Sequence, residues 1–162
     1  MKNILQSLLA LLLVAGLCAC GMIKGGGQED GTVEFVSFSF THTGMSTDEC
    51  YLYSVQQTEE GVRLYTEELF SGGQIVDTVI DEPVLEQLSG IAEKYRMIRW
   101  DGFDKKNRRV SDGSRFVLSA ELSDGRTISA SGSNKFPEGY ADAEQEIRTL
   151  FEDLIGKYGA DS

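Results

Sequence analysis

The sequence predicts a single α+β domain, in which an antiparallel sheet of about six strands carries two helices on one face. Short β-rich segments with alternating apolar residues occur in two groups, at 32–80 and 115–131. Two longer segments, 83–97 and 138–158, have apolar residues at helical spacing, and each follows one group of strands. Consecutive strands with short connections favour antiparallel pairing, so the order ββββαββα predicts a two-layer domain.

The first group contains four predicted strands. Residues 32–43 form a β-rich run with five large apolar side chains, which predicts a largely buried strand. Short turns rich in Gly, Glu and Ser separate the next three segments, which suit a meander of neighbouring strands. These segments are 50–58, 62–70 and 75–80.

The first helix is expected to begin next to Pro83. Proline suits the first helical position, and the preceding Asp81 and Glu82 suit the positive end of the helix dipole. Apolar residues then recur at helical spacing as far as Tyr95, so we expect the helix to end near Met97.

The second group predicts a β-hairpin followed by a second helix. Residues 115–122 alternate, Asp124-Gly125 is a strong hairpin signal, and 127–131 returns along the first strand. On the exposed face of the last helix, Glu144 is expected to pair with Arg148. The apolar stripe of this last helix contains Ile147, Leu150, Phe151, Leu154, Ile155 and Tyr158.

The first twenty residues predict an export signal and are set apart from the fold. Lys2 supplies a positive start, and the apolar stretch 4–17 is shorter than the roughly 20 residues of a membrane-spanning helix. A permanent spanning anchor is the alternative.

The end of this stretch, Leu17-Cys18-Ala19-Cys20, resembles the lipobox of bacterial lipoproteins. The resemblance implies that 1–19 is a lipoprotein signal peptide and that Cys20 is lipidated to become the new amino terminus. Two or more acyl chains anchor a protein stably to a membrane. The membrane would thus be a partner of Cys20, and the protein would be extracytoplasmic, on the cell membrane or the outer membrane. A plain secretory signal is the other possibility.

The rest of the chain divides simply. Residues 20–31 contain the lipidated Cys and a Gly-rich tether, 32–159 form the single domain, and 160–162 are a tail. After processing, Cys50 would be the remaining thiol, and burial is the simplest expectation for it.

Composition and motifs exclude several function classes. The net charge of −11 argues against a nucleic-acid partner, because phosphate backbones require a basic surface. His42 is the single histidine and no Gly-x-Ser-x-Gly elbow is present, so no catalytic residue is assigned. His42 and Cys50 are too few to hold zinc, and neither a metal site nor a cofactor is expected.

Chain direction brings several distinctive loops to one end of the sheet. If each strand opposes the one before it and each helix runs back along the sheet, the loops 42–49, 71–74, 100–112 and 132–137 lie opposite the tether. Donors at the start of the second helix, with nearby cations, suit an anion or carboxylate. The candidate ligand-facing residues are Trp100, Phe103, Lys105, Lys106, Arg108, Arg109, Asn134 and Lys135. Alternatively, the two aromatic residues plug the core and the cations balance an acidic surface.

Segments 100–103, 112–113, 124–125 and 133–137 resemble parts of uncharacterised bacterial lipoprotein domains, and this resemblance brings no catalytic residues. We therefore expect a membrane-anchored binding or interaction module, with an envelope protein or a small anionic ligand as its partner. The alternative is an envelope enzyme that uses carboxylate and Arg side chains without His. The oligomeric state is left open.

Overall fold

The computed structural model describes residues 32–70, 73–110 and 112–159. The expected signal peptide 1–19, the lipidated Cys20 with its tether, and the tail 160–162 lie outside these residues. Among the helices in the described ranges, none is both long and apolar enough to span a bilayer.

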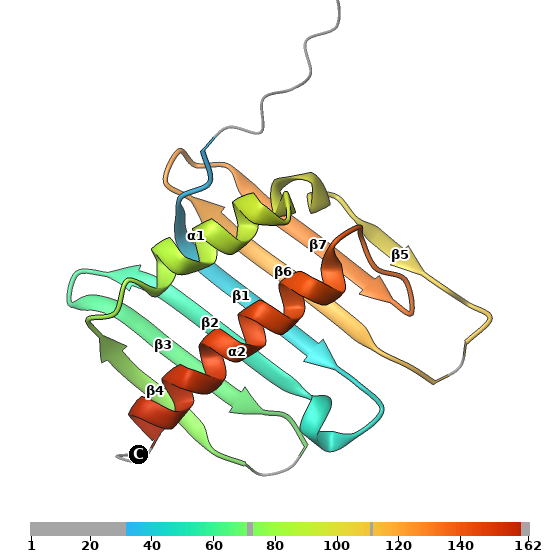
Figure 1. Ribbon diagram of the computed structural model, residues 1–162, viewed down its shortest axis with the longest axis horizontal. Helices are drawn as coiled ribbons and strands as arrows, with labels where there is room; N and C mark the ends of the chain where they lie inside the picture. Colours follow the sequence, from blue (N-terminus) through green and yellow to red (C-terminus); the bar gives the residue numbers. More distant parts are fainter. Residues whose placement is uncertain (1–31, 71–72, 111, 160–162) are drawn as a thin grey trace, which may run out of the picture.

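Seven strands form one sheet in the order β4-β3-β2-β1-β6-β7-β5 (Figure 1). Neighbouring strands are antiparallel except β5 and β7, which pair in parallel. The strands are β1 (Phe35–Thr43), β2 (Tyr51–Thr58), β3 (Gly61–Glu68), β4 (Ile75–Ile80), β5 (Asp104–Lys106), β6 (Arg115–Leu122) and β7 (Thr127–Ser133).

Both helices cross the same face of this sheet (Figure 1). They are α1 (Val84–Lys94) and α2 (Tyr140–Tyr158), and two short 3₁₀ helices, η1 (Thr47–Glu49) and η2 (Met97–Trp100), lie in the connections. Alternate residues of the strands are buried beneath the helices, because successive side chains of a strand point to opposite faces. The α+β class predicted from the sequence is confirmed.

The prediction of an antiparallel sheet of about six strands differs from the structure in one element. Strand β5 lies inside the segment predicted as a loop, and it gives the order ββββαβββα. The amide of Ser131 donates to the carbonyl of Phe103 at 2.6 Å, and that of Asn107 donates to Ser133 at 2.9 Å. All three residues of β5 are exposed, so no alternation of apolar residues marks the strand in the sequence.

The expectation that α1 runs along the strands to the far end of the sheet is also wrong. Its carboxyl-terminal half lies beside the beginning of β1, where Glu93 accepts from the amide of Val33 at 3.2 Å. Ser89 accepts from the amide of Phe35 at 3.0 Å. The chain then rejoins the sheet in the middle of β7, where the amide of Gly102 donates to Ser129 at 2.9 Å.

The core between the sheet and the helices is rich in aromatic residues. Phe116 is fully buried, and its ring centroid lies 4.6 Å from that of Tyr140 and 6.4 Å from those of Phe40 and Trp100. Cys50 is also buried, as expected from the sequence, and its thiol donates to the carbonyl of Ser46 at 3.3 Å.

Candidate functional site

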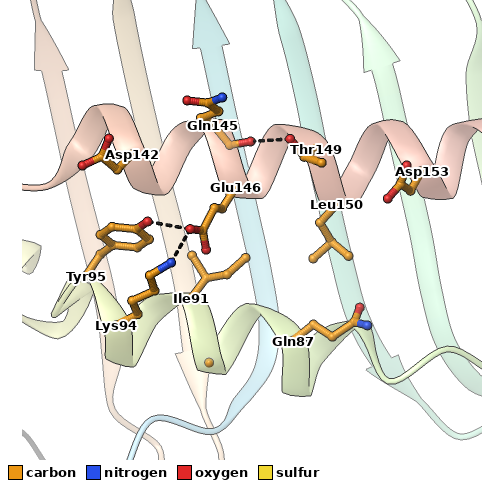
Figure 2. Close-up of a pocket in the computed structure, with 11 residues that line it drawn as sticks. Gln87, Ile91, Lys94, Tyr95, Asp142, Gln145, Glu146, Thr149, Leu150 and Asp153 are labelled. Atoms are coloured by element: carbon orange, nitrogen blue, oxygen red, sulfur yellow. Dashed lines mark hydrogen bonds and ion pairs between the residues drawn. The ribbon is translucent and has the colours of Figure 1, made fainter.

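A groove with a volume of about 680 Å³ lies between α1 and α2 (Figure 2). Glu146 occupies its middle, where it forms an ion pair with Lys94 and accepts from the Tyr95 hydroxyl at 2.6 Å. The hydrogen bond from Lys94 lowers the pKa of Glu146, and the same contact raises the pKa of Lys94. Asp142 and Asp153 also line the groove, so it offers little attraction to an anion.

A second hollow, with a volume of about 560 Å³, lies where α1 ends and α2 begins. We call it the cationic cleft, because three cations line it against one acid. Its lining residues are Lys94, Tyr95, Arg96, Arg99, Trp100, Phe103, Pro137, Glu138 and Gly139.

Local backbone conformation builds the cleft. Arg96 has a φ of 53°, in the left-handed region, and this ends α1 and starts η2. The 3₁₀ turn buries Met97 and Trp100 and leaves Arg96 and Arg99 exposed. On the opposite wall, Gly139 has a φ of 76°, which glycine adopts without steric cost. This residue forms the turn that precedes α2.

Trp100 and Phe103 contribute more to the core than to the surface of the cleft. Trp100 is 3% exposed, and its indole nitrogen donates to the carbonyl of Glu138 at 3.2 Å. Phe103 is half-buried, with its ring centroid 6.2 Å from that of Phe116. The ammonium of Lys105 lies 5.1 Å from the centre of the Phe103 ring. Only part of each aromatic ring is therefore available to a ligand.

The other candidate residues do not line this cleft. The segment after β5 lies beside the end of β7, where the side-chain amide of Asn134 donates to the carbonyl of Val110 at 3.4 Å. The basic loop and Asn134 are thus neighbours at the far end of the sheet, but they are separate from Trp100 and Phe103. This second group consists of Lys106, Arg108, Arg109, Asn134 and Lys135.

Sequence reasoning missed the cations that do line the cleft. Lys94, Arg96 and Arg99 occur within the six residues before the single tryptophan, and this clustering was the available signal. Their shared position became visible only once the direction of α1 was known.

A polar cluster between β1, β2 and α2 was also missed. A hydrogen bond of 2.8 Å joins Nδ1 of His42 to the Tyr140 hydroxyl, and Tyr51 donates to Glu144. Burial lowers the pKa of His42, although Glu144 opposes this, and burial raises the pKa of both tyrosines. At pH 7 the His42 ring is therefore uncharged, and the hydroxyls of Tyr51 and Tyr140 keep their protons.

The contacts of Glu144 replace an expected ion pair. Arg148 pairs with Glu152 at 2.7 Å, so the predicted pairing of Glu144 with Arg148 is wrong. A glutamate that faces a buried tyrosine hydroxyl gains a charged hydrogen bond, which is stronger than an exposed helical ion pair.

Carboxylates elsewhere act as hydrogen-bonded surface groups. Hydrogen bonds are the largest cause of the lowered pKa in five of them, namely Asp48, Asp77, Glu82, Asp124 and Glu146. In the three described ranges, His, Cys, Asp and Glu side chains do not gather in threes that could hold a metal ion.

A scan against protein-family models finds no match to this chain, and a search of curated proteins finds no similar sequence. The function is therefore argued from the geometry of the cleft.

Proposed function

We propose that this chain is a lipid-anchored envelope protein whose domain binds a small anionic ligand in the cationic cleft. One observation carries the proposal: Lys94, Arg96 and Arg99 line a single hollow in a chain of net charge −11. A local concentration of positive charge on an acidic protein attracts anions to that place. The lipobox resemblance at 17–20 supports the anchor.

Arg96 is the central residue of the proposed site. Lys94 is already paired with Glu146, so we expect Arg96 to bind the ligand directly. Within the described part of the chain, the guanidinium of Arg96 has no ion-pair partner. A guanidinium donates two parallel hydrogen bonds to a carboxylate or a phosphate, which gives both affinity and orientation.

The remaining walls define the shape of the ligand. The volume of about 560 Å³ falls within the usual range for small-molecule sites. The half-buried ring of Phe103 offers apolar contact beside the cations, and the nearly buried Trp100 forms the base of the same hollow. We therefore expect a carboxylate or phosphate ester with a small apolar body.

Trp100 provides a direct test, because it is the single tryptophan of the chain and lines the cleft. Phenyl phosphate is titrated against the full chain in detergent while tryptophan fluorescence is recorded. Arg96→Gln removes a charged hydrogen bond and is expected to weaken binding about 10- to 100-fold.

Arg63→Gln is the matched control. It removes the same charge from an exposed residue on β3, where Arg63 pairs with Asp77 at 2.7 Å. Binding by this variant should equal that of the wild type. An equal loss in both variants, or a fluorescence spectrum that phenyl phosphate leaves unchanged, would overturn the proposal.

A further inference from the structure

The cationic cleft lies on the side of the domain where the described chain begins. Arg96 lines the cleft, and it also lines a neighbouring hollow of about 350 Å³ together with Thr32 and Val33. The amide of Val33 donates to the side chain of Glu93, three residues before Arg96. Figure 1 shows the start of β1 beside the end of α1, whereas α2 ends on the other side of the domain. The chain therefore enters the domain next to the cleft.

This placement limits how far the cleft can lie from an anchor at Cys20. Thr32 is twelve residues after Cys20, and twelve residues of fully extended chain span at most about 43 Å. A lipid anchor would thus keep Thr32, and the cleft beside it, within that distance of the bilayer surface. Head groups of the same membrane would then meet the cleft at a high effective concentration, so a modest affinity is sufficient for binding.

The walls of the cleft carry charges of both signs. Arg96 and Arg99 are exposed where α1 passes into η2. Glu138 is exposed on the opposite wall, just before α2, and its carbonyl accepts the hydrogen bond from Trp100. Within the described ranges, the carboxylate of Glu138 has no ion-pair partner. A ligand can therefore place a negative group against Arg96 and a positive group against Glu138.

The charge of the whole chain limits which lipids suit the cleft. With a net charge of −11, the protein is repelled by a membrane surface that is rich in anionic lipids. A zwitterionic head group has no net charge, so it avoids this repulsion and still presents a phosphate to the arginines. The ammonium of ethanolamine donates hydrogen bonds that suit the Glu138 carboxylate, whereas the methylated ammonium of choline has no donor. These charges favour phosphoethanolamine over phosphoglycerol and phosphocholine.

The aromatic lining of the cleft suits the part of a lipid next to its phosphate. Tyr95 and Phe103 are half-buried residues of the lining, and the nearly buried Trp100 forms its base. The Tyr95 hydroxyl donates to Glu146 at 2.6 Å, which holds the ring in place. Aromatic rings with one polar edge are typical of surfaces that meet the head-group region of a membrane. The cleft thus offers apolar contact to the glycerol carbons of a lipid.

We propose, on the basis of the function proposed above, that the cationic cleft binds the phosphoethanolamine head group of a lipid in the membrane that holds the anchor. The phosphate pairs with Arg96, and the ammonium pairs with Glu138. The acyl chains of this lipid stay in the bilayer, so the cleft turns toward the membrane surface. The bound lipid and the anchor at Cys20 then fix the orientation of the domain from two points.

Calorimetric titration with soluble head groups tests the chemistry of the cleft. Glycerophosphoethanolamine and glycerol phosphate are titrated against the full chain in dodecyl maltoside. Glu138→Gln is expected to weaken the binding of glycerophosphoethanolamine about tenfold without weakening that of glycerol phosphate, whereas Arg96→Gln should weaken both. Glu86→Gln, at an exposed position in the first turn of α1, is the matched control and should bind both compounds like the wild type. Thermal melting verifies that the three variants are folded.

Trp100 fluorescence in vesicles tests whether the head group comes from the membrane. The full chain is reconstituted into phosphatidylcholine vesicles that contain rising fractions of phosphatidylethanolamine, and the emission spectrum of the single tryptophan is recorded. Phosphatidylethanolamine is expected to change the spectrum of the wild type and of Glu86→Gln, but not that of Glu138→Gln. An equal fraction of phosphatidylglycerol should have a smaller effect on the wild type.

Failure of lipid binding is distinguishable from failure of the function proposed above. If phenyl phosphate binds but phosphatidylethanolamine leaves the vesicle spectrum unchanged, the cleft takes a soluble anion and lipid binding is overturned. Equal affinity of Glu138→Gln and the wild type for glycerophosphoethanolamine, or an equal effect of phosphatidylglycerol in the vesicles, would overturn the choice of a zwitterionic head group. If neither phenyl phosphate nor any head group binds, the cleft is not an anion site and both proposals are wrong.

Discussion

Replacing Gly132 by alanine is expected to destabilise the domain, because this position has no room for a β-carbon. A β-carbon placed on Gly132 would lie 2.6 Å from Cε1 of Phe116, and closer still to the carbonyl oxygen of Lys135. Both groups would have to move by about 1 Å to restore normal contacts. Moving the carbonyl of Lys135 shifts the segment after β7, and moving Phe116 disturbs a ring that is fully buried against Trp100 and Tyr140.

The cost of such overpacking is about 1 to 3 kcal/mol, which lowers the melting temperature of a domain of this size by about 3 to 15 °C. Thermal unfolding followed by far-ultraviolet circular dichroism measures the change. Gly90→Ala is the control, because a β-carbon at Gly90 meets no atom within 4 Å. That substitution, within α1, should stabilise the domain by about 0.5 to 1 kcal/mol. Melting of Gly132→Ala at or above the wild-type temperature would refute the steric argument.

Two further predictions concern the anchor and the response to pH. Cys20→Ser should move the expressed protein from the detergent phase to the aqueous phase in a Triton X-114 partition; retention in the detergent phase would contradict lipidation at Cys20. Burial lowers the pKa of His42 from 6.5 in the folded state. As the pH falls, this histidine is therefore protonated in the unfolded chain before it is protonated in the folded one. The contribution of His42 to stability is greatest above pH 6.5 and is lost as the pH falls below that value. His42→Gln should reduce this loss in urea unfolding between about pH 5 and 8; equal slopes would contradict it.

Periodicity in the sequence was sufficient for most of the fold. The six strands with alternating apolar residues and both helices appear where the patterns placed them, and their boundaries differ by a few residues. Strand β5 carried no such pattern, because Asp104, Lys105 and Lys106 are all exposed and hold their place through backbone hydrogen bonds to β7. A strand of this kind is defined by its neighbour and cannot be recognised from its own residues.

The site was harder to predict, for a geometric reason. The apolar stripe of α1 shows which side of the helix is buried, but it does not show the angle at which the helix crosses the sheet. That angle decides which residues surround Trp100. The structure brings Trp100 and Phe103 into one cleft with Arg96 and Arg99, and it leaves Arg108 at the other end of β5.

The two outer strands of the sheet differ in their resistance to polymerisation. A strand with an unpaired edge can template the addition of another chain, and proteins limit this with short edge strands and lysine side chains. Strand β5 has both features, with three residues that include Lys105 and Lys106. Strand β4 is twice as long, and its Ile75 and Val79 are 51% and 40% exposed. The lysines of β5 thus hinder the addition of another chain at that edge of the sheet. Fibril growth by strand addition would start at β4.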